Sequence, residues 1–266
     1  MNCLPSYHFK LGLLLAAIGL SSCHILDRDE LPKVAATAES SAVSSLTRSG
    51  PPRDVLFVGN SFTYYNNSLH NHYRKLVLAA RGSNWPNSAR LMAISGGRLE
   101  EHRGGLQQRL NDQDFDVVVL QGHSLEALDA YGRFEAAATD YADAIRADGA
   151  QPVLFMTWAY TFRPKMTARL VTAYSRVGRK LHAPVVPVGL AFAAVMAERP
   201  DLALRIADNR HPTLVGTYLG ACTMFGALHQ QSPVDLRYTA GLPEADARYL
   251  RATSWKVLQD FQSRSR

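Results

Sequence analysis

The chain of 266 residues has little that points to nucleic acid or to a membrane-spanning helix. Its 29 Lys and Arg residues against 23 Asp and Glu residues give a net charge of +6, but the basic residues form no long run and no repeat with aromatic residues. Nucleic-acid binding is therefore not expected. After residue 23, no segment has the length and apolarity of a membrane span. The composition, 47% apolar and 20% charged, is typical of a globular protein with a substantial core.

The first residues have the pattern of an export signal. Lys10 precedes the apolar run LGLLLAAIGL, residues 11–20, which has the length of a signal-peptide core and is short for a bilayer span. The run ends in LSSC, which resembles the bacterial lipobox, whose cysteine becomes the lipid-bearing first residue of the mature protein. We expect residues 1–22 to be a lipoprotein signal peptide and Cys23 to be lipidated. The lipid would anchor the protein in the bacterial cell envelope, on the outer-membrane or periplasmic face. The alternative is a conventional secretory signal in which Cys23 is incidental.

Cysteine is scarce, with three residues in the whole chain. Loss of Cys3 with the signal peptide and lipidation of Cys23 would leave Cys222 as the only thiol, so no intramolecular disulfide is expected. Residues 23–52 are rich in Ala, Ser, Thr and Pro without a sustained apolar period, and we expect the lipidated cysteine to be followed by a flexible tether. Residues 53–266 are then expected to form one domain.

From Arg53 onward, short apolar runs alternate with amphipathic stretches. The apolar runs predict buried strands of a parallel sheet over residues 54–60, 89–95, 115–121, 151–158 and 183–190. The stretches between them predict helices over residues 69–80 with Gly82 as C-cap, through Phe134, Tyr141 and Ile145 to about Gly149, and from Met166 to Leu181. Strands that alternate with helices indicate βαβ units and an α/β fold.

Polar residues or glycines follow the first three predicted strands. Ser61 follows the first strand, Gly96 lies in the Ser-Gly-Gly loop after the second, and Gln121-Gly122-His123-Ser124 follows the third. In a parallel sheet, ligands bind at the carboxyl ends of the strands, so these loops are expected to meet at one rim. Ser61 is therefore a candidate nucleophile, although Gly, Asn and Ser also occur in ordinary turns.

A serine nucleophile needs a base and a carboxylate that orients the base. The segment ADNRHPTLVG places Asp208 three residues before His211, and Pro212 and Thr213 then mark the start of a helix. A carboxylate at this spacing can hold the Nδ1–H of the imidazole while Nε2 faces a serine. By itself an Asp-x-x-His pair is a weak indication, because solvated and helix-capping histidines are common.

Together, four segments resemble the conserved blocks of the SGNH (GDSL-type) hydrolases. They are VGNSFT near the domain start, a glycine after the second strand, the polar loop after DVVVLQ, and DNRHP near the end. The resemblance implies a three-layer α/β/α sandwich with a central parallel sheet (SGNH/flavodoxin-like). It also implies that Ser61 is the nucleophile, His211 the base and Asp208 its partner. The backbone N–H groups of Ser61 and Gly96 would form the oxyanion hole.

The chain departs from the family pattern in two blocks. Asn60 stands where the first block usually has Asp, and a neutral amide can keep the same turn hydrogen bonds. The third block usually supplies an Asn to the oxyanion hole, whereas LQGHSLEA has none; its start resembles the Gln-Gly-x-Ser of carbohydrate and sialate O-acetylesterases in the same superfamily. The side chain of Gln121 is expected as a further oxyanion donor, with His123 as the alternative. An α/β-hydrolase fits less well, because GNSFT lacks the second glycine of the nucleophile elbow.

The resemblance implies a serine esterase that removes small acyl groups, with acetyl as the expected group, from glycans of the cell envelope or of the diet or environment. An acyl-enzyme would form at Ser61, and no metal or organic cofactor is required. The partners would be an acylated small molecule or glycan and, through the lipid, a membrane; the oligomeric state stays open. Two alternatives remain: an O-acyltransferase that uses the same triad, and a non-catalytic glycan-binding lipoprotein, which the absent third-block Asn favours.

Other conspicuous residues have competing interpretations. His70 and His72 lie two apart on a predicted helix and face different directions, so a metal pair is not expected there. Trp158 and Tyr160 follow the fourth strand and can either stack on a sugar ring or cap the core. Cys222 lies on the apolar face of the last predicted helix and is expected to be a buried structural thiol.

Overall fold

The computed structural model describes residue 46 and residues 50–264. The predicted signal peptide (residues 1–22), Cys23 and the predicted tether apart from residues 46 and 50–52 lie outside the described residues. The predictions made for them stay predictions. Leu46 packs against the core, and Pro52 is buried directly before the first strand.

Five parallel strands form the central sheet, and their order is β2-β1-β3-β4-β5. They are β1 (Asp54–Gly59), β2 (Ser88–Ala93), β3 (Val117–Leu120), β4 (Gln151–Phe155) and β5 (Val185–Val186). Each lies within a segment predicted as a strand or starts one residue before it. The strands β1, β3 and β4 are apolar because both faces of the sheet are covered, and every residue of β3 is buried.

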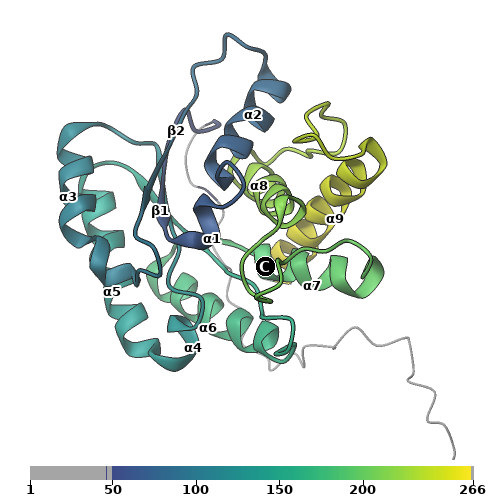
Figure 1. The fold of residues 1–266 in the computed structure, drawn as a ribbon. Coiled ribbons are helices and arrows are strands. Elements are labelled where there is room, and N and C mark those ends of the chain that lie inside the picture. Colours follow the sequence, from purple (N-terminus) through teal and green to yellow (C-terminus); the bar gives the residue numbers. More distant parts are fainter. Residues whose placement is uncertain (1–45, 47–49, 265–266) are drawn as a thin grey trace, which may run out of the picture. The chain divides into compact units, whose positions relative to one another are not determined.

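Helices cover both faces of this sheet (Figure 1), which confirms the predicted three-layer α/β/α fold. On one side lie α3 (Arg103–Asp112), α4 (Glu126–Asp129), α5 (Tyr131–Ala147) and α6 (Met166–Leu181). On the other side lie α2 (Leu69–Arg81), α7 (Val188–Glu198), α8 (Leu214–His229) and α9 (Glu244–Ser263). Two short elements, α1 (Ser61–Tyr64) and the 3-10 helix η1 (Leu99–His102), follow β1 and precede α3.

The two edge strands differ from the prediction of long, buried strands. β2 has a neighbour on one side only, and each of its residues is at least partly exposed. β5 contains two residues, whereas the sequence predicted a strand through residue 190. Pro187 ends it, because proline has no N–H to donate to a ladder, and α7 begins at the next residue.

The strand order has a topological switch point beside β1. The chain leaves β1 outward to β2 and then returns across the sheet to β3, so β1 and β3 are neighbours from which the chain continues in opposite directions along the sheet. Ligands bind at such a switch point in open parallel sheets with this strand order. Val58 pairs with Leu120 in the β1–β3 register, and the loops that begin at Asn60 and Gln121 therefore lie side by side.

Candidate active site

Ser61 is the first residue of α1 and follows directly from β1. Asn60 caps this helix, since its Oδ1 accepts a hydrogen bond of 3.1 Å from the backbone N–H of Phe62. Gly59 ends the strand where no side chain fits, because a Cβ would lie 2.4 Å from Thr63 Oγ1 and 2.5 Å from Gln121 Oε1. The short path from strand to helix thus holds the Ser61 hydroxyl at the rim of the sheet.

The structure brings Ser61, His211 and Asp208 together. Ser61 Oγ lies 2.8 Å from His211 Nε2, and the other ring nitrogen, Nδ1, is hydrogen-bonded to Asp208 Oδ2. Because a carboxylate accepts, Nδ1 carries the hydrogen in this arrangement and Nε2 is free to accept the serine proton. This is the geometry of an activated serine nucleophile. Asp208 and His211 come from one loop between α7 and α8, 150 residues from Ser61 along the chain.

Asp208 is held as a carboxylate by three donors. Its Oδ1 accepts from the backbone N–H groups of Arg210 and His211, each at 3.0 Å, and its Oδ2 accepts from the ring of His211. Partial burial opposes ionisation, but the hydrogen bonds from the His211 ring and from these two N–H groups outweigh it and lower the pKa of Asp208 well below its usual range. The carboxylate is therefore charged at neutral pH.

Aromatic rings fix the position of His211. Tyr65 stacks on the imidazole with 4.7 Å between ring centroids, and Phe62 meets its edge at 5.6 Å. Trp158 lies sandwiched between Phe62 and Phe192, at 4.5 and 4.2 Å, and donates its indole N–H to the carbonyl of Arg210 at 2.8 Å. One ring thus braces both the residue after Ser61 and the residue before His211.

This packing decides between the two interpretations of Trp158 and Tyr160. Trp158 is 1% exposed, so its faces are not available to a sugar, and it belongs to the core. Tyr160 is also buried, and its hydroxyl lies 2.7 Å from Ser124 Oγ. Both residues are buried and hydrogen-bond to loops of the site, Trp158 to Arg210 and Tyr160 to Ser124.

The loop that contains Gly96 is hydrogen-bonded to residues 59 and 60, directly before Ser61. Ile94 donates its N–H to the carbonyl of Gly59 at 3.2 Å, and Asn60 Nδ2 donates to the carbonyl of Gly97 at 3.1 Å. Gly96 has a φ of +66°, a conformation that favours glycine. Within the described residues, the N–H groups of Ser61 and Gly96 have no protein acceptor. Both remain free to donate to a ligand oxygen.

Gln121 has a different place from the one expected. Its Nε2 donates to Asn60 Oδ1 at 2.8 Å and to the carbonyl of Gly122 at 3.0 Å, which uses both amide hydrogens. Its Oε1 accepts from the Thr63 hydroxyl and from the Asn60 N–H. In this arrangement the side chain has no hydrogen left for an oxyanion, and it connects Asn60 and Thr63 to the loop after β3. The alternative donor, His123, accepts at Nδ1 from the N–H of Leu125 at 3.4 Å.

Two buried residues support the same loops without having been singled out from the sequence. The ring of His102 lies between two carbonyl oxygens, with Nε2 at 2.8 Å from that of Gly59 and Nδ1 at 3.0 Å from that of Arg98. Glu126 Oε2 accepts from the N–H groups of Leu99 and His123 at 3.2 and 3.0 Å, so it joins the loops after β2 and β3. The contacts that join different loops, from His102 to Gly59 and from Glu126 to Leu99, span 43 and 27 residues, so the local sequence carries no signal for them.

Three further findings concern metal ligands, the free thiol and helix hydropathy in the described part of the chain. No group of three or more His, Cys, Asp or Glu side chains there is placed to hold a metal ion. Cys222 is fully buried, as predicted, and burial raises the pKa of its thiol to about 12, so it is not a nucleophile. None of the helices from residue 50 to residue 264 combines the length and hydropathy needed to cross a bilayer.

The fold is that of the SGNH hydrolases. A provisionally assigned SGNH hydrolase from Slackia heliotrinireducens is 25% identical and superimposes with a TM-score of 0.56 over 66% of this chain and 98% of its own. A DUF4886 family protein from Bacteroides uniformis is 18% identical with a TM-score of 0.64, over 78% of this chain and 95% of its own. A catalytic mutant of an acetylxylan esterase from Geobacillus stearothermophilus is 14% identical with a TM-score of 0.55, over 68% of this chain and 95% of its own. No protein-family profile matches the chain, and no curated protein matches it in sequence.

Proposed function

We propose that the protein is an SGNH-type serine esterase that hydrolyses small acyl esters, acetyl esters above all, carried by a glycan. The observation that carries the proposal is the 2.8 Å contact between Ser61 Oγ and His211 Nε2, with Asp208 on the opposite ring nitrogen. The structural neighbours support the class of reaction, since they include SGNH hydrolases and acetylxylan esterases. Their low identity leaves the substrate to be tested.

The mechanism follows from the arrangement of the three residues. Ser61 Oγ attacks the ester carbonyl and gives its proton to His211 Nε2, while Asp208 stabilises the imidazolium that forms. The N–H groups of Ser61 and Gly96 donate to the oxygen that becomes negative. His211 then returns the proton to the leaving alcohol, and an acyl-enzyme remains on Ser61. Water gives a proton to His211 and attacks the acyl carbonyl. The acid is released when His211 returns that proton to Ser61 Oγ.

A fluorophosphonate probe tests whether the triad is active. We expect the probe to label the wild-type protein and to spare Ser61→Ala, because only an activated serine attacks phosphorus. Heat-denatured wild-type protein is the control for non-specific labelling. Equal labelling of both folded proteins would place the reactive group elsewhere, and no labelling of either would favour the glycan-binding alternative. Transfer of acetyl to an added sugar hydroxyl in place of acetate release would identify an acyltransferase.

We further propose that the protein acts at the bacterial cell envelope through a lipid on Cys23. The support is the sequence LSSC behind an apolar run of ten residues. Cys23→Ala should leave the chain unprocessed or mislocalised, which membrane fractionation and metabolic labelling with a fatty-acid analogue measure. Processing and attachment of that variant like the wild-type protein would contradict the lipid anchor.

A further inference from the structure

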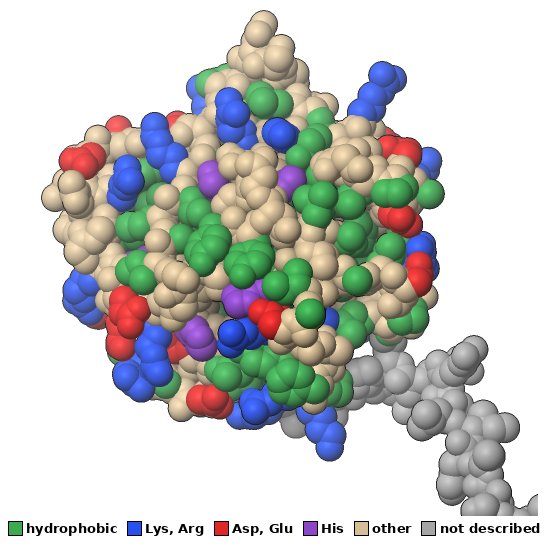
Figure 2. All heavy atoms as spheres, viewed as in Figure 1, with side chains coloured by type: hydrophobic (Ala, Val, Ile, Leu, Met, Phe, Trp, Pro, Cys, Tyr) green, Lys and Arg blue, Asp and Glu red, His purple; other side chains and the backbone are tan. Residues whose placement is uncertain are grey.

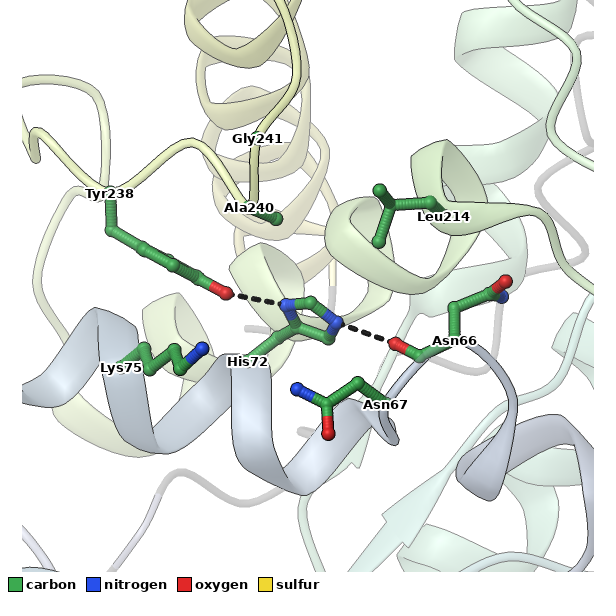
Figure 3. Close-up of a pocket in the computed structure, with 8 residues that line it drawn as sticks. All are labelled: Asn66, Asn67, His72, Lys75, Leu214, Tyr238, Ala240 and Gly241. Carbon is green, nitrogen blue, oxygen red and sulfur yellow. Dashed lines mark hydrogen bonds between the residues drawn. The ribbon is translucent and has the colours of Figure 1, made fainter.

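A pocket of about 510 Å³ opens beside the catalytic triad, on the side of α2. Figure 3 shows its walls: the turn before α2, the side of that helix that carries His72 and Lys75, the start of α8 and the loop before α9. The lining residues are Asn66, Asn67, His72, Lys75, Leu214, Tyr238, Ala240 and Gly241. A volume of this size holds a small ligand such as a sugar unit.

Both ring nitrogens of His72, at the back of the pocket, have hydrogen-bond partners. His72 Nε2 lies 2.7 Å from the carbonyl of Asn66, so it carries the hydrogen, and Nδ1 then accepts from the Tyr238 hydroxyl at 2.7 Å. Burial lowers the pKa of His72, with the charge of Lys75 acting in the same direction, so the ring is neutral at neutral pH. His72 therefore shapes the pocket and adds no charge to it.

Two donors on the rim are free. Among the described residues, Lys75 Nζ has no carboxylate within ion-pair distance, and Asn67 Nδ2 has no acceptor. The Lys75 ammonium lies over the Tyr238 ring, 5.6 Å from its centroid, which limits where the charge can be. In Figure 3 the ends of Lys75 and Asn67 extend toward the space in front of His72 from opposite sides.

The charge of the pocket selects the class of ligand. Lys75 provides its one full charge, and no acidic side chain lines it. A ligand that displaces water from an ammonium without providing a counter-charge loses solvation free energy, whereas a carboxylate or phosphate forms a charge-assisted hydrogen bond. The Asn67 amide can donate to an oxygen of the sugar ring that carries the anion.

Two residues that line the pocket contact or belong to the segment that follows His211. Asn66 lines the pocket and donates from Nδ2 to the carbonyl of Pro212 at 2.9 Å, directly after His211. Its neighbour Tyr65 stacks on the His211 ring. Leu214, which also lines the pocket, is three residues beyond His211, so the two Cα atoms are at most about 11 Å apart. Sugar units next to an ester at Ser61 can therefore reach the pocket.

We propose that this pocket is a subsite for an anionic sugar unit, so that the preferred substrate is an acylated acidic glycan. Lys75 would bind the anionic group and Asn67 a neighbouring oxygen, while the ester lies at Ser61. The proposal rests on the esterase function for the position of the ester, but the binding of the anion does not depend on catalysis.

The first test compares two substrates in three proteins. The probes are acetylated oligogalacturonides, which carry carboxylates, and acetylated xylo-oligosaccharides, which are neutral. We expect the ratio of kcat/KM on the acidic to the neutral substrate to fall about tenfold in Lys75→Gln, the usual worth of a charge-assisted hydrogen bond. Lys256→Gln makes the same change on α9, away from the pocket, and should keep the wild-type ratio. An unchanged ratio in Lys75→Gln would overturn the proposal.

The second test needs no turnover and separates the subsite from the esterase. Calorimetry with oligogalacturonides that carry no acetyl group measures binding alone. We expect Kd to rise about tenfold in Lys75→Gln and to stay unchanged in Lys256→Gln. If the esterase function fails while this difference holds, the subsite stands by itself. Equal Kd values in all three proteins, or binding of neutral xylo-oligosaccharides as tight as that of the acidic ones, would refute the anionic subsite.

Discussion

The two sides of the candidate active site hold their residues by different interactions. The nucleophile side, residues 59–63 with Gln121 and His102, is buried and connected by hydrogen bonds between side chains and backbone. The base side, residues 206–213, is a surface loop in which Asp208 keeps about a third of its side chain exposed. Two aromatic residues contact this loop: Tyr65 stacks on the His211 ring, and Trp158 donates a hydrogen bond to the Arg210 carbonyl. Figure 2 shows a face on which histidine, acidic and basic side chains lie together among hydrophobic ones.

The difference between the two sides predicts where a substitution changes folding stability and catalytic activity together. A change on the nucleophile side leaves buried polar groups without partners, so it should cost stability and activity together. A change on the base side affects groups that water can reach, so it should cost activity with little loss of stability. The following predictions test that separation, from the largest expected effect to the smallest.

The triad itself should give the largest loss. Ser61→Ala and His211→Ala should each lower kcat on p-nitrophenyl acetate by about 10⁴–10⁶, and the double variant should be scarcely worse, because the residues act as a unit. Asp208→Asn should lose less, since it orients the base and does not carry the proton. The thermal midpoint of His211→Ala, a change on the base side, should stay near that of the wild-type protein. Purified, folded Ser61→Ala with wild-type kcat would remove Ser61 from the mechanism.

Gly96 should be the most sensitive backbone position. Gly96→Ala forces a side chain onto a φ of +66° and turns the peptide whose N–H is proposed to face the oxyanion. We expect kcat to fall by up to about 10²–10³, the worth of one such donor. Gly82→Ala is the matched control, because Gly82 also has a positive φ and open space but ends α2. Equal kcat values for the two variants would show that the Gly96 N–H is not part of the oxyanion hole.

Gln121 should couple stability to activity. Gln121→Met keeps the approximate volume but leaves Asn60, Thr63 and the Gly122 carbonyl without their partner. We expect the free energy of unfolding to fall by about 3 kcal/mol and kcat to fall by about 10- to 100-fold. Gln107→Met, on the exposed face of α3, should change neither in urea titrations and assays. Loss of activity in Gln121→Met without loss of stability would instead support Gln121 as a direct oxyanion donor.

Trp158 should affect the base side more weakly. Trp158→Phe keeps a ring between Phe62 and Phe192 but removes the hydrogen bond to the Arg210 carbonyl. We expect about 1 kcal/mol in the activation free energy, or roughly fivefold in kcat. Trp85→Phe removes an indole N–H that has no partner in the described residues and should leave kcat unchanged. A Trp158→Phe enzyme as active as wild type would show that aromatic packing alone positions the loop.

The smallest effect should be a pH-dependent difference in stability. The pKa of Asp208 is lower in the folded protein than its usual 3.8, so the carboxylate contributes stability above that pH, which is lost as the pH falls through the folded pKa. Asp208→Asn lacks this dependence. In urea titrations, the advantage of the wild-type protein over Asp208→Asn should thus be full at pH 7 and smaller at pH 3. A constant difference would mean that the carboxylate is not stabilised by the loop.

Local patterns were sufficient to predict much of this protein. Alternating apolar and amphipathic runs indicated the five parallel strands, and α2 ends at the predicted Gly82. Ser61 at a strand end and Asp208 three residues before His211 could be recognised because strand ends and short spacings are visible in the sequence. The fold class followed from the same periodicity, since a strand buried on both faces needs apolar residues on both.

Tertiary structure alone decided which partner each polar or aromatic side chain has. The Gln121 amide can donate to a ligand or to its neighbours, and the choice depends on Asn60, which is 61 residues away. Trp158 can face a sugar or the core, and Phe62 and Phe192 enclose it. The pocket beside the triad joins residues 66–75 to residues 214–241. Such pairings depend on where the chain returns in space, because hydrogen bonds and ring contacts act over a few ångströms and carry no mark in the local sequence.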